Sequence, residues 1–187
     1  MRKLYIGISG KMGSGKSTLT QGIIRETPTP CEVVSLAKPI KDTQNLIYEH
    51  LNMKMVGEKD RDLLIALGMW GRGRCSNFWL DKAVEAMFNS EAQVIICDDV
   101  RFQNEAEWFK KNGILMRITG EQRGPNVDHN VNNKTETALD SFPFDYYVDN
   151  RGGIQRTLEN ALYCIQDYLT KRNKEDADGR KQERLPS

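Results

Sequence analysis

The stretch GKMGSGKST, residues 10–18, decides which fold the sequence predicts. It follows the apolar run LYIGI, residues 4–8, and precedes a segment in which Leu19, Ile23 and Ile24 recur at helical spacing. The stretch fits the pattern G-x-x-x-x-G-K-[ST], which is typical of a phosphate-binding loop between a buried strand and a helix. We therefore predict a P-loop at this position.

Each part of this loop has a physical reason. Glycines let backbone N–H groups approach a phosphate closely, and the helix that follows adds the positive end of its dipole. Lys16 can reach the β and γ phosphates of ATP, and Ser17 can ligate Mg²⁺. The loop residues predicted to bind the nucleotide are Gly10, Lys11, Gly13, Ser14, Gly15, Lys16, Ser17 and Thr18.

The composition is that of a globular chain with one hydrophobic core. Of its 187 residues, 39% are hydrophobic and 28% are charged, and the formal net charge is +1. This charge does not favour nucleic acid or an anionic membrane, so we expect neither as a partner. The mean hydropathy is −0.61, and no apolar run reaches the length of a membrane span. The four cysteines are far apart, so we expect reduced thiols and a cytoplasmic location. Gly7, Gly10 and Lys11 interrupt the short apolar stretch at the N-terminus, so we expect no signal peptide.

Apolar runs and helical periodicities alternate along the chain. Strands are predicted at residues 3–9, 32–37, 93–97, 114–119 and 145–149, with helical patterns between most of them. This alternation favours an α/β fold of three layers, in which helices cover both faces of a mostly parallel sheet. A long amphipathic helix is predicted from Ile154 to Leu169.

A carboxylate for the metal side of the site is predicted at the end of the third strand. Residues 93–97, QVIIC, are the clearest buried strand, and Asp98 and Asp99 follow it directly. Ligands of parallel α/β folds bind at the carboxyl edge of the sheet, where both aspartates would lie. We assign Asp98 to Mg²⁺, although sequence alone leaves open which of the two faces the metal and which caps the next helix.

A GTP-binding switch is a rival class of P-loop protein. The sequence matches two of its motifs, with NKED at residues 173–176 and D-x-x-G at residues 149–152. The NKED match lacks the apolar strand that should lead into it, so we interpret both matches as accidental. A P-loop ATPase that binds a partner without phosphorylating it is a weaker alternative, because it would have no use for the cations described next.

The cations of the chain favour a kinase that acts on a small acceptor bearing a phosphate. Between the second strand and the helix after the third lie Lys38, Lys41, Arg61, Arg72, Arg74 and Arg101. Arginine suits this task because its planar fork binds two phosphate oxygens at once. Such enzymes exclude water with a lid, and residues 120–140, which include Arg123 and Lys134, have a suitable composition and place.

These observations predict one kinase domain and a tail. The domain comprises residues 1–170, within which residues 38–91 form a helical region that binds the acceptor and residues 120–140 form the lid. Residues 171–187 are rich in charge and are predicted to be disordered. The sequence does not fix the oligomeric state and leaves a homodimer open.

Several longer motifs carry a family resemblance. They include IGISGKMGSGKSTL, LAKPIKD, R-D-L-L-x-x-L-G followed by GR, FWLD, DDVRFQNEAEWF, ETALD and FPFDYYVDN. In these motifs the chain resembles the bacteriophage deoxynucleoside monophosphate kinases from residue 4 to about residue 153. The resemblance implies a nucleoside monophosphate kinase fold with a lid and transfer of the γ-phosphoryl of ATP, with Mg²⁺, to a deoxynucleoside monophosphate (dNMP). A chain encoded by a bacteriophage would act in the host cytoplasm.

The resemblance also implies roles for individual residues on the acceptor side. Asp99, Arg101 and Glu105 match the acceptor-site motif of the family, and the first two are expected to act in catalysis with Lys16 and Arg123. Further acceptor contacts are implied for Ala37, Lys38, Arg61, Arg72 and Trp79. Of these, the two arginines would bind the acceptor phosphate, and the tryptophan would contact its base or sugar.

On the donor side, Asn150 and Gly152 lie where related kinases hold adenine. The lid departs from the family pattern, because His129 lies seven residues before Glu136 and Thr135 stands in place of a serine. The resemblance therefore leaves the roles of this histidine and glutamate open. A dephospho-coenzyme A kinase, or a kinase of another small metabolite, is the alternative enzyme.

Overall fold

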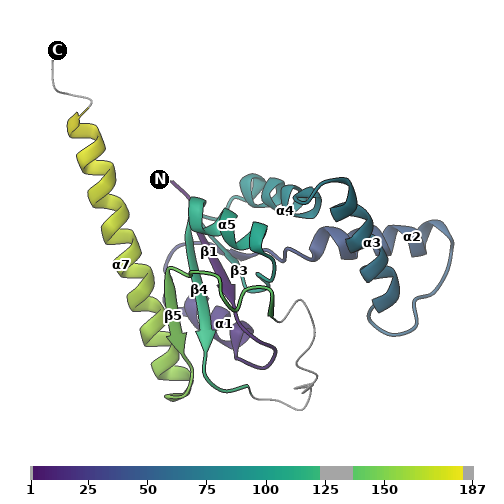
Figure 1. The fold of residues 1–187 in the computed structure, drawn as a ribbon, viewed down its shortest axis with the longest axis horizontal. Coiled ribbons are helices and arrows are strands. Elements are labelled where there is room, and N and C mark those ends of the chain that lie inside the picture. Colours follow the sequence, from purple (N-terminus) through teal and green to yellow (C-terminus); the bar gives the residue numbers. More distant parts are fainter. Residues whose placement is uncertain (1, 123–136, 183–187) are drawn as a thin grey trace.

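The centre of the molecule is a five-stranded sheet in the order β2-β3-β1-β4-β5, in which all neighbouring strands are parallel. A computed structural model describes residues 2–122 and 137–182. The strands are β1 (Leu4–Ser9), β2 (Cys31–Val33), β3 (Val94–Cys97), β4 (Ile114–Thr119) and β5 (Tyr146–Asp149). The predicted α/β fold with a mostly parallel sheet is confirmed (Figure 1).

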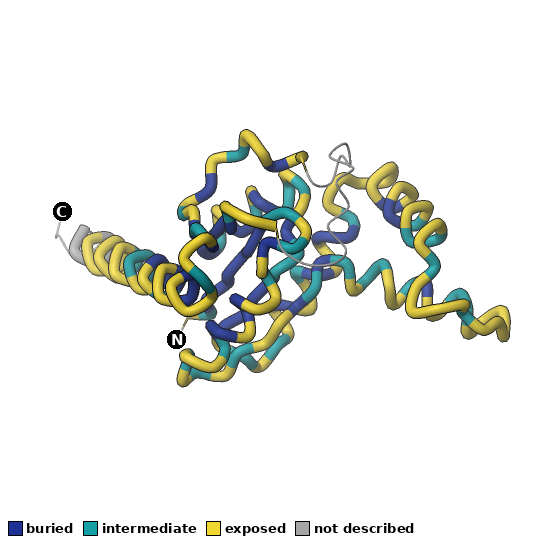
Figure 2. Tube along the Cα trace, turned by 90° about the horizontal axis from the view of Figure 1, so that it is seen from below, coloured by how far each residue is buried: buried dark blue, intermediate teal, exposed yellow. Residues whose placement is uncertain are grey.

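Helices cover both faces of this sheet. The described helices are α1 (Lys16–Glu26), α2 (Lys38–His50), α3 (Arg61–Arg74), α4 (Phe78–Asn89), α5 (Gln103–Asn112) and α7 (Gly153–Gln182), and those that pack on the sheet are α1, α4, α5 and α7. Because successive side chains of a strand point to opposite faces, Ile6 and Ile8 pack with α1 and α7, whereas Tyr5 packs with α4 and α5. Figure 2 shows the buried positions concentrated in the sheet and on the helix faces against it.

The register of the strands brings the predicted functional segments to one edge of the sheet. Ile6 of β1 pairs with Ile96 of β3 on one side and with Ile114 of β4 on the other. Since the strands are parallel, their carboxyl ends lie at the same edge, where parallel α/β folds bind ligands. The P-loop that follows β1 is therefore next to Asp98, which follows β3.

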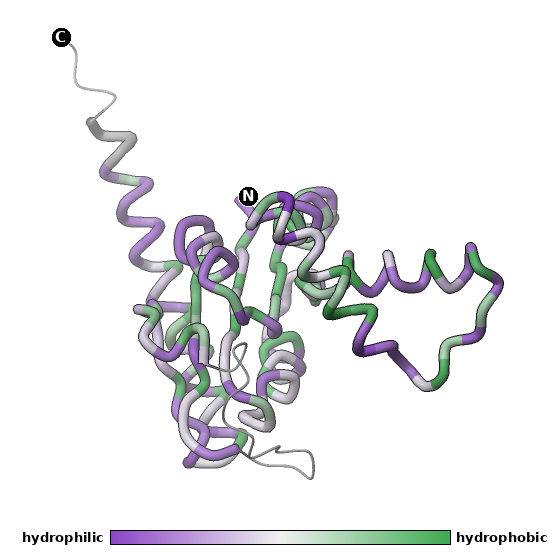
Figure 3. Tube along the Cα trace, turned by 45° about the vertical axis from the view of Figure 1, so that its right-hand side comes forward, coloured by the Kyte–Doolittle hydropathy of each residue, from purple (hydrophilic) through white to green (hydrophobic). Residues whose placement is uncertain are grey.

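Helices α2 and α3 form an arm that projects from the sheet (Figures 1 and 3). Asp60 joins the two helices. Its Oδ1 accepts the N–H of Leu63 at 3.0 Å and so caps α3, its Oδ2 accepts the hydroxyl of Tyr48 at 2.8 Å, and its main-chain carbonyl accepts the amide of Gln44 at 2.6 Å. The helical region predicted for residues 38–91 is present as this arm together with α4.

The second strand is shorter than the sequence predicts. We expected residues 32–37 to be extended, but β2 ends at Val33 and α2 begins at Lys38. The apolar pattern misled the prediction because Val34 and Leu36 are buried without belonging to the strand. The chain leaves the sheet here because donors of residues 35–37 bind the carboxylate of Asp99.

The terminal helix is longer than predicted, and the prediction of a disordered tail is wrong for residues 171–182. Helix α7 continues to Gln182. Lys171 forms an ion pair with Asp167 one turn earlier at 2.6 Å, and Asp167 also accepts the hydroxyl of Tyr146. Adding residues to a helix that is already packed avoids the cost of nucleation, so a charged segment can continue it. No helix of the described residues, α7 included, has an apolar stretch long enough to cross a membrane.

Candidate active site

The P-loop joins the end of β1 to the start of α1. Gly15 is the residue before α1 and has φ 89°, in the left-handed region that favours glycine. This conformation turns the chain so that the backbone N–H groups at the start of α1 point away from the helix. The Nζ of Lys16 donates to the carbonyl oxygens of Gly10, at 2.7 Å, and Lys11, at 2.9 Å.

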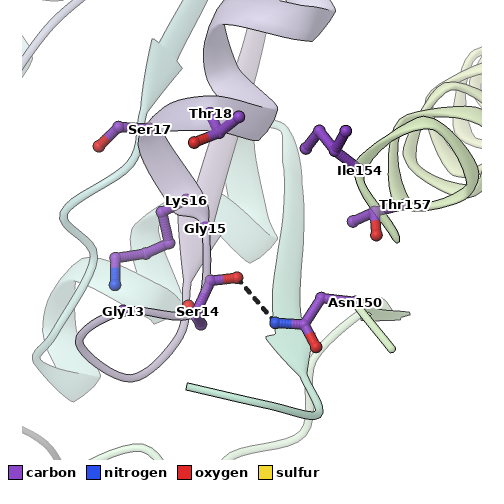
Figure 4. Close-up of a pocket in the computed structure, with 9 residues that line it drawn as sticks. All are labelled: Gly13, Ser14, Gly15, Lys16, Ser17, Thr18, Asn150, Ile154 and Thr157. Atoms are coloured by element: carbon purple, nitrogen blue, oxygen red, sulfur yellow. Dashed lines mark hydrogen bonds between the residues drawn. The ribbon is translucent and has the colours of Figure 1, made fainter. Parts of the chain in front are cut away.

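A pocket of about 430 Å³ lies against this loop (Figure 4). Its lining comprises Gly13, Ser14, Gly15, Lys16, Ser17, Thr18, Asn150, Ile154 and Thr157. The pocket thus combines the N-terminus of α1 with the segment after β5 and the first turns of α7. Most of the predicted nucleotide-binding residues lie on its wall.

Ile154 and Thr157 belong to the pocket, but the sequence analysis assigned them to the terminal helix only. The signal that could have identified them is their place just past the fifth strand, at the carboxyl edge of the sheet. Gly152, for which an adenine contact was implied, precedes α7 and is not part of the lining.

The two aspartates after β3 point to different neighbours. Oδ2 of Asp98 accepts the hydroxyl of Thr20, on the first turns of α1, at 3.4 Å. The carboxylate of Asp99 accepts three donors of the loop before α2, which are Ser35 Oγ at 2.6 Å, Leu36 N–H at 2.9 Å and Ala37 N–H at 3.2 Å. Asp98 is therefore the carboxylate on the P-loop side.

This arrangement fits a Mg²⁺ ion held partly by a nucleotide. Among residues 2–122 and 137–182, no group of three or more His, Cys, Asp or Glu side chains could hold a metal. In P-loop enzymes the protein supplies one hydroxyl and one carboxylate, and phosphate oxygens and water complete the coordination. Ser17 and Asp98 are the oxygen donors of that type here.

On the side where the sequence predicts the acceptor, Arg72, Phe102 and Glu105 lie together where β3 leads into α5. The guanidinium carbon of Arg72 is 4.8 Å from the centroid of the Phe102 ring. Glu105 Oε2 accepts the backbone N–H groups of Arg101, at 2.8 Å, and Phe102, at 3.0 Å, and so caps α5. Two members of this cluster, Phe102 and Glu105, belong to the D-V-R-F-x-N-E run at residues 99–105, which lies at the same edge of the sheet as the P-loop.

The Glu105 carboxyl is perturbed in this cluster. Its pKa is raised from 4.5 to about 7, chiefly by burial; the negative charge of Asp99 also raises the pKa, whereas the two backbone N–H groups and Arg72 lower it. A carboxyl that titrates near neutral pH beside a cation is common at functional sites.

The structure does not bring all the predicted acceptor residues together. Arg61 and Arg72 lie at opposite ends of α3, about 16 Å apart along the helix axis at 1.5 Å per residue. Lys38 is exposed at the start of α2, where it pairs with Asp42 one turn later. The Arg61 and Lys38 contacts with the acceptor stay predictions.

The contact predicted between Trp79 and the base or sugar of the acceptor is corrected, because this tryptophan packs within the protein and not in an open site. Its side chain is buried, and its indole N–H donates to the carbonyl of Leu67 on α3 at 3.2 Å. Gly71 of α3 leaves the space that the indole fills. Trp70, which no motif of the sequence indicates, is half exposed, and the guanidinium carbon of Arg74 lies 5.6 Å from the centroid of its ring.

The predicted lid falls mostly outside the described residues. Arg123, His129 and Glu136 belong to residues 123–136, which the structure does not describe. The catalytic role expected for Arg123 stays a prediction.

The parallel sheet and the P-loop at its carboxyl edge define the class of protein, which is an ATP-dependent kinase of the P-loop type. A family model described as phosphomevalonate kinase matches residues 8–114, and the chain belongs to that family. The matched segment runs from β1 to the start of β4 and contains the P-loop, the arm and the D-V-R-F-x-N-E run. A search of curated proteins finds no match.

Solved structures of small-molecule kinases share the fold. A gluconokinase from Sinorhizobium meliloti 1021 aligns with a TM-score of 0.56 at 13% identity, over 94% of this chain and 99% of that one. A shikimate kinase from Aquifex aeolicus vf5 has a TM-score of 0.53 at 12% identity, over 87% and 96% of the two chains. The protein TT1252 from Thermus thermophilus has a TM-score of 0.53 at 19% identity, over 90% and 99%. Identities this low establish the shared fold alone.

Proposed function

We propose that the protein is a deoxynucleoside monophosphate kinase, which transfers the γ-phosphoryl of ATP to the phosphate of a dNMP. The observation that carries the proposal is the cluster of Arg72, Phe102 and Glu105 at the sheet edge that also bears the P-loop. A kinase whose acceptor is a phosphate needs cations on the acceptor side, because two anions must approach each other. Arginine is suited to that task by its bidentate geometry.

The residues of the chain would divide the work between donor and acceptor. The backbone N–H groups of the P-loop and Lys16 would bind the β and γ phosphates, and Arg72 and Arg101 would hold the acceptor phosphate in line. Ser17 and Asp98 would hold Mg²⁺, which neutralises charge on the transferring phosphate when it is bound. No general base is required, because a phosphate oxygen is already a nucleophile at neutral pH.

The identity of the acceptor rests on two separate lines. The motif DDVRFQNEAEWF, through its resemblance to the bacteriophage kinases, favours a dNMP. The match to the phosphomevalonate kinase family favours phosphomevalonate as the second candidate. Both acceptors are phosphate monoesters, so Arg72 and Arg101 could bind the phosphate of either one. The assay must therefore separate the two acceptors.

A panel assay tests the proposal. Purified protein, ATP and Mg²⁺ would be combined with each dNMP, each ribonucleotide, phosphomevalonate and dephospho-coenzyme A, and ADP formation would be followed, with Lys16→Ala as the inactive control. We expect one or more dNMPs to give the highest kcat/KM and the matching ribonucleotides to be poorer. Highest activity with phosphomevalonate or dephospho-coenzyme A would assign the second or third candidate. An equal rate of ADP formation with no acceptor present would indicate an ATPase.

A further inference from the structure

Asn150 is a buried polar residue at the junction of three segments. It directly follows β5, and the residue is more than nine-tenths buried, with 8% exposure. Burying an amide costs free energy unless its donors and acceptor find partners. The partners of this amide therefore indicate what the residue does.

The Asn150 amide is bonded on both of its ends. Its Nδ2 donates to the carbonyl of Ser14 in the P-loop at 3.0 Å and to the carbonyl of Glu121 at 2.6 Å. Its Oδ1 accepts the N–H of Glu121 at 2.8 Å. Both N–H groups are thus used within the protein, and the side chain joins the P-loop to the residue that follows β4 and Gly120.

Gly120 makes room for this amide. It has φ 107°, where glycine is favoured, and a β-carbon at this position would collide with Oδ1 of Asn150. The backbone after β4 is therefore shaped to receive the Asn150 side chain. This fit between Gly120 and the Asn150 amide is independent of the hydrogen bonds, and it also indicates that the fold holds the amide in this place.

The bond to Ser14 fixes the direction of a peptide group in the P-loop. A trans peptide is planar, with its C=O and N–H pointing in opposite directions, and the described chain has no cis peptide bond. Because the Ser14 carbonyl points toward Asn150, the N–H of Gly15 must point the opposite way. Figure 4 shows the Lys16 side chain on that other side of Ser14.

We propose that Asn150 is a positioning residue that holds the Ser14–Gly15 peptide so that the Gly15 N–H is directed at a bound phosphate. This inference rests on the proposed function only in that the P-loop binds ATP, and it does not depend on which acceptor is used. It replaces the adenine contact expected for the Asn150 side chain. Without the bond, the peptide before a glycine can rotate at little cost, since glycine tolerates both signs of φ.

Binding of ATP and of tripolyphosphate, both with Mg²⁺, separates the two roles. Tripolyphosphate has the phosphates of ATP and no adenine. If Asn150 positions the P-loop, Asn150→Asp should weaken both ligands by the same factor, at least about tenfold by calorimetry. An adenine contact would instead weaken ATP and leave tripolyphosphate unchanged, and that result would overturn the inference, as would no change in either ligand.

Two further variants keep the test sound. Asn112→Asp is the control, because it removes a comparable side-chain donor at the other edge of the sheet. The Asn112 amide donates to the Trp108 carbonyl at 2.8 Å, and its loss should leave the affinities for ATP and tripolyphosphate unchanged. Gly120→Ala leaves Asn150 chemically intact but displaces its amide, and should weaken both ligands as Asn150→Asp does. Full affinity in a folded Gly120→Ala, confirmed by circular dichroism, would contradict the inference. Failure of the wild-type protein to bind ATP would instead refute the proposed function.

Discussion

We expect Asp99→Asn to lower the stability of the protein, because Asp99 holds the loop that leads into α2. Its carboxylate accepts the donors of Ser35, Leu36 and Ala37 at 2.6, 2.9 and 3.2 Å. An asparagine side chain offers one oxygen where the carboxylate offers two. One of the three donors would therefore face an amide N–H₂ group, and the other two would bond a neutral acceptor.

The magnitude follows from the number of bonds affected. A hydrogen bond to a charged group contributes about 1.5–3 kcal/mol and a neutral one about 0.5–1.5 kcal/mol, and an unsatisfied buried donor costs about 1–3 kcal/mol. Weakening two bonds and losing one at a partly exposed site gives roughly 2–4 kcal/mol. For a chain of this size that corresponds to a fall in Tm of roughly 5–15 °C.

Urea unfolding of Asp99→Asn beside Asp98→Asn tests this reasoning. Asp98 accepts the Thr20 hydroxyl at 3.4 Å, a long contact, so its substitution should cost less than about 1 kcal/mol while lowering activity at limiting Mg²⁺. The expected pattern is thus a stability defect for one aspartate and a metal-dependent activity defect for the other. Equal destabilisation by the two variants, or a loss below about 1 kcal/mol for Asp99→Asn, would refute the reasoning.

Four further predictions concern other parts of the chain. Lys16→Ala should lower kcat by on the order of 10³-fold, since it removes the cation that we propose contacts the transferring phosphate; near-normal turnover would contradict the P-loop assignment. Arg101→Lys keeps the charge but loses the bidentate fork, so the KM for the acceptor should rise at least about tenfold while the KM for ATP barely moves. Because the pKa of Glu105 is raised to about 7 by burial, its contribution to stability is present below about pH 4.5 and is lost as the pH rises through 7. Urea unfolding at several pH values should therefore show a loss of wild-type stability over this range that Glu105→Gln lacks, and identical profiles would contradict the buried environment. Removing residues 173–187 should change Tm by less than about 2 °C, because the side chains described from Asn173 to Asp178 are exposed; a larger fall would show that this segment packs against the domain.

The parts of the fold that the sequence predicts well are those with a local signal. Residues 94–97 are a continuous apolar run, residues 114–119 are apolar except for Arg117 and Thr119, and both segments are buried strands in the sheet. The P-loop is equally local, because its glycines, lysine and serine occupy fixed positions between a strand and a helix. In each case the pattern needs no knowledge of a distant partner.

The parts that the sequence does not predict depend on distant partners. Ser14 and Asn150 are 136 positions apart, so nothing near either residue indicates the hydrogen bond between them. Trp79 is buried because Gly71 on another helix leaves space for its indole, and a tryptophan beside arginines gives no sign of that space. The apolar pattern of residues 34–37 predicts a strand, but these residues form a buried loop that Asp99 holds in place. The pattern alone does not distinguish a strand from such a loop.

The two halves of the proposed site differ in what fixes their geometry, and from this difference we expect the helical region to govern the choice of acceptor. The donor half is built on the sheet, since the P-loop continues β1, Asp98 continues β3 and Asn150 continues β5. The proposed acceptor half uses Arg72 of α3, which belongs to the projecting arm and contacts Phe102 at the sheet edge. Close by, the Asn104 amide donates to Ser76 and Asn77, between α3 and α4. Substitutions in α2 and α3 should therefore change which acceptor is used, whereas substitutions in the P-loop should impair every acceptor alike.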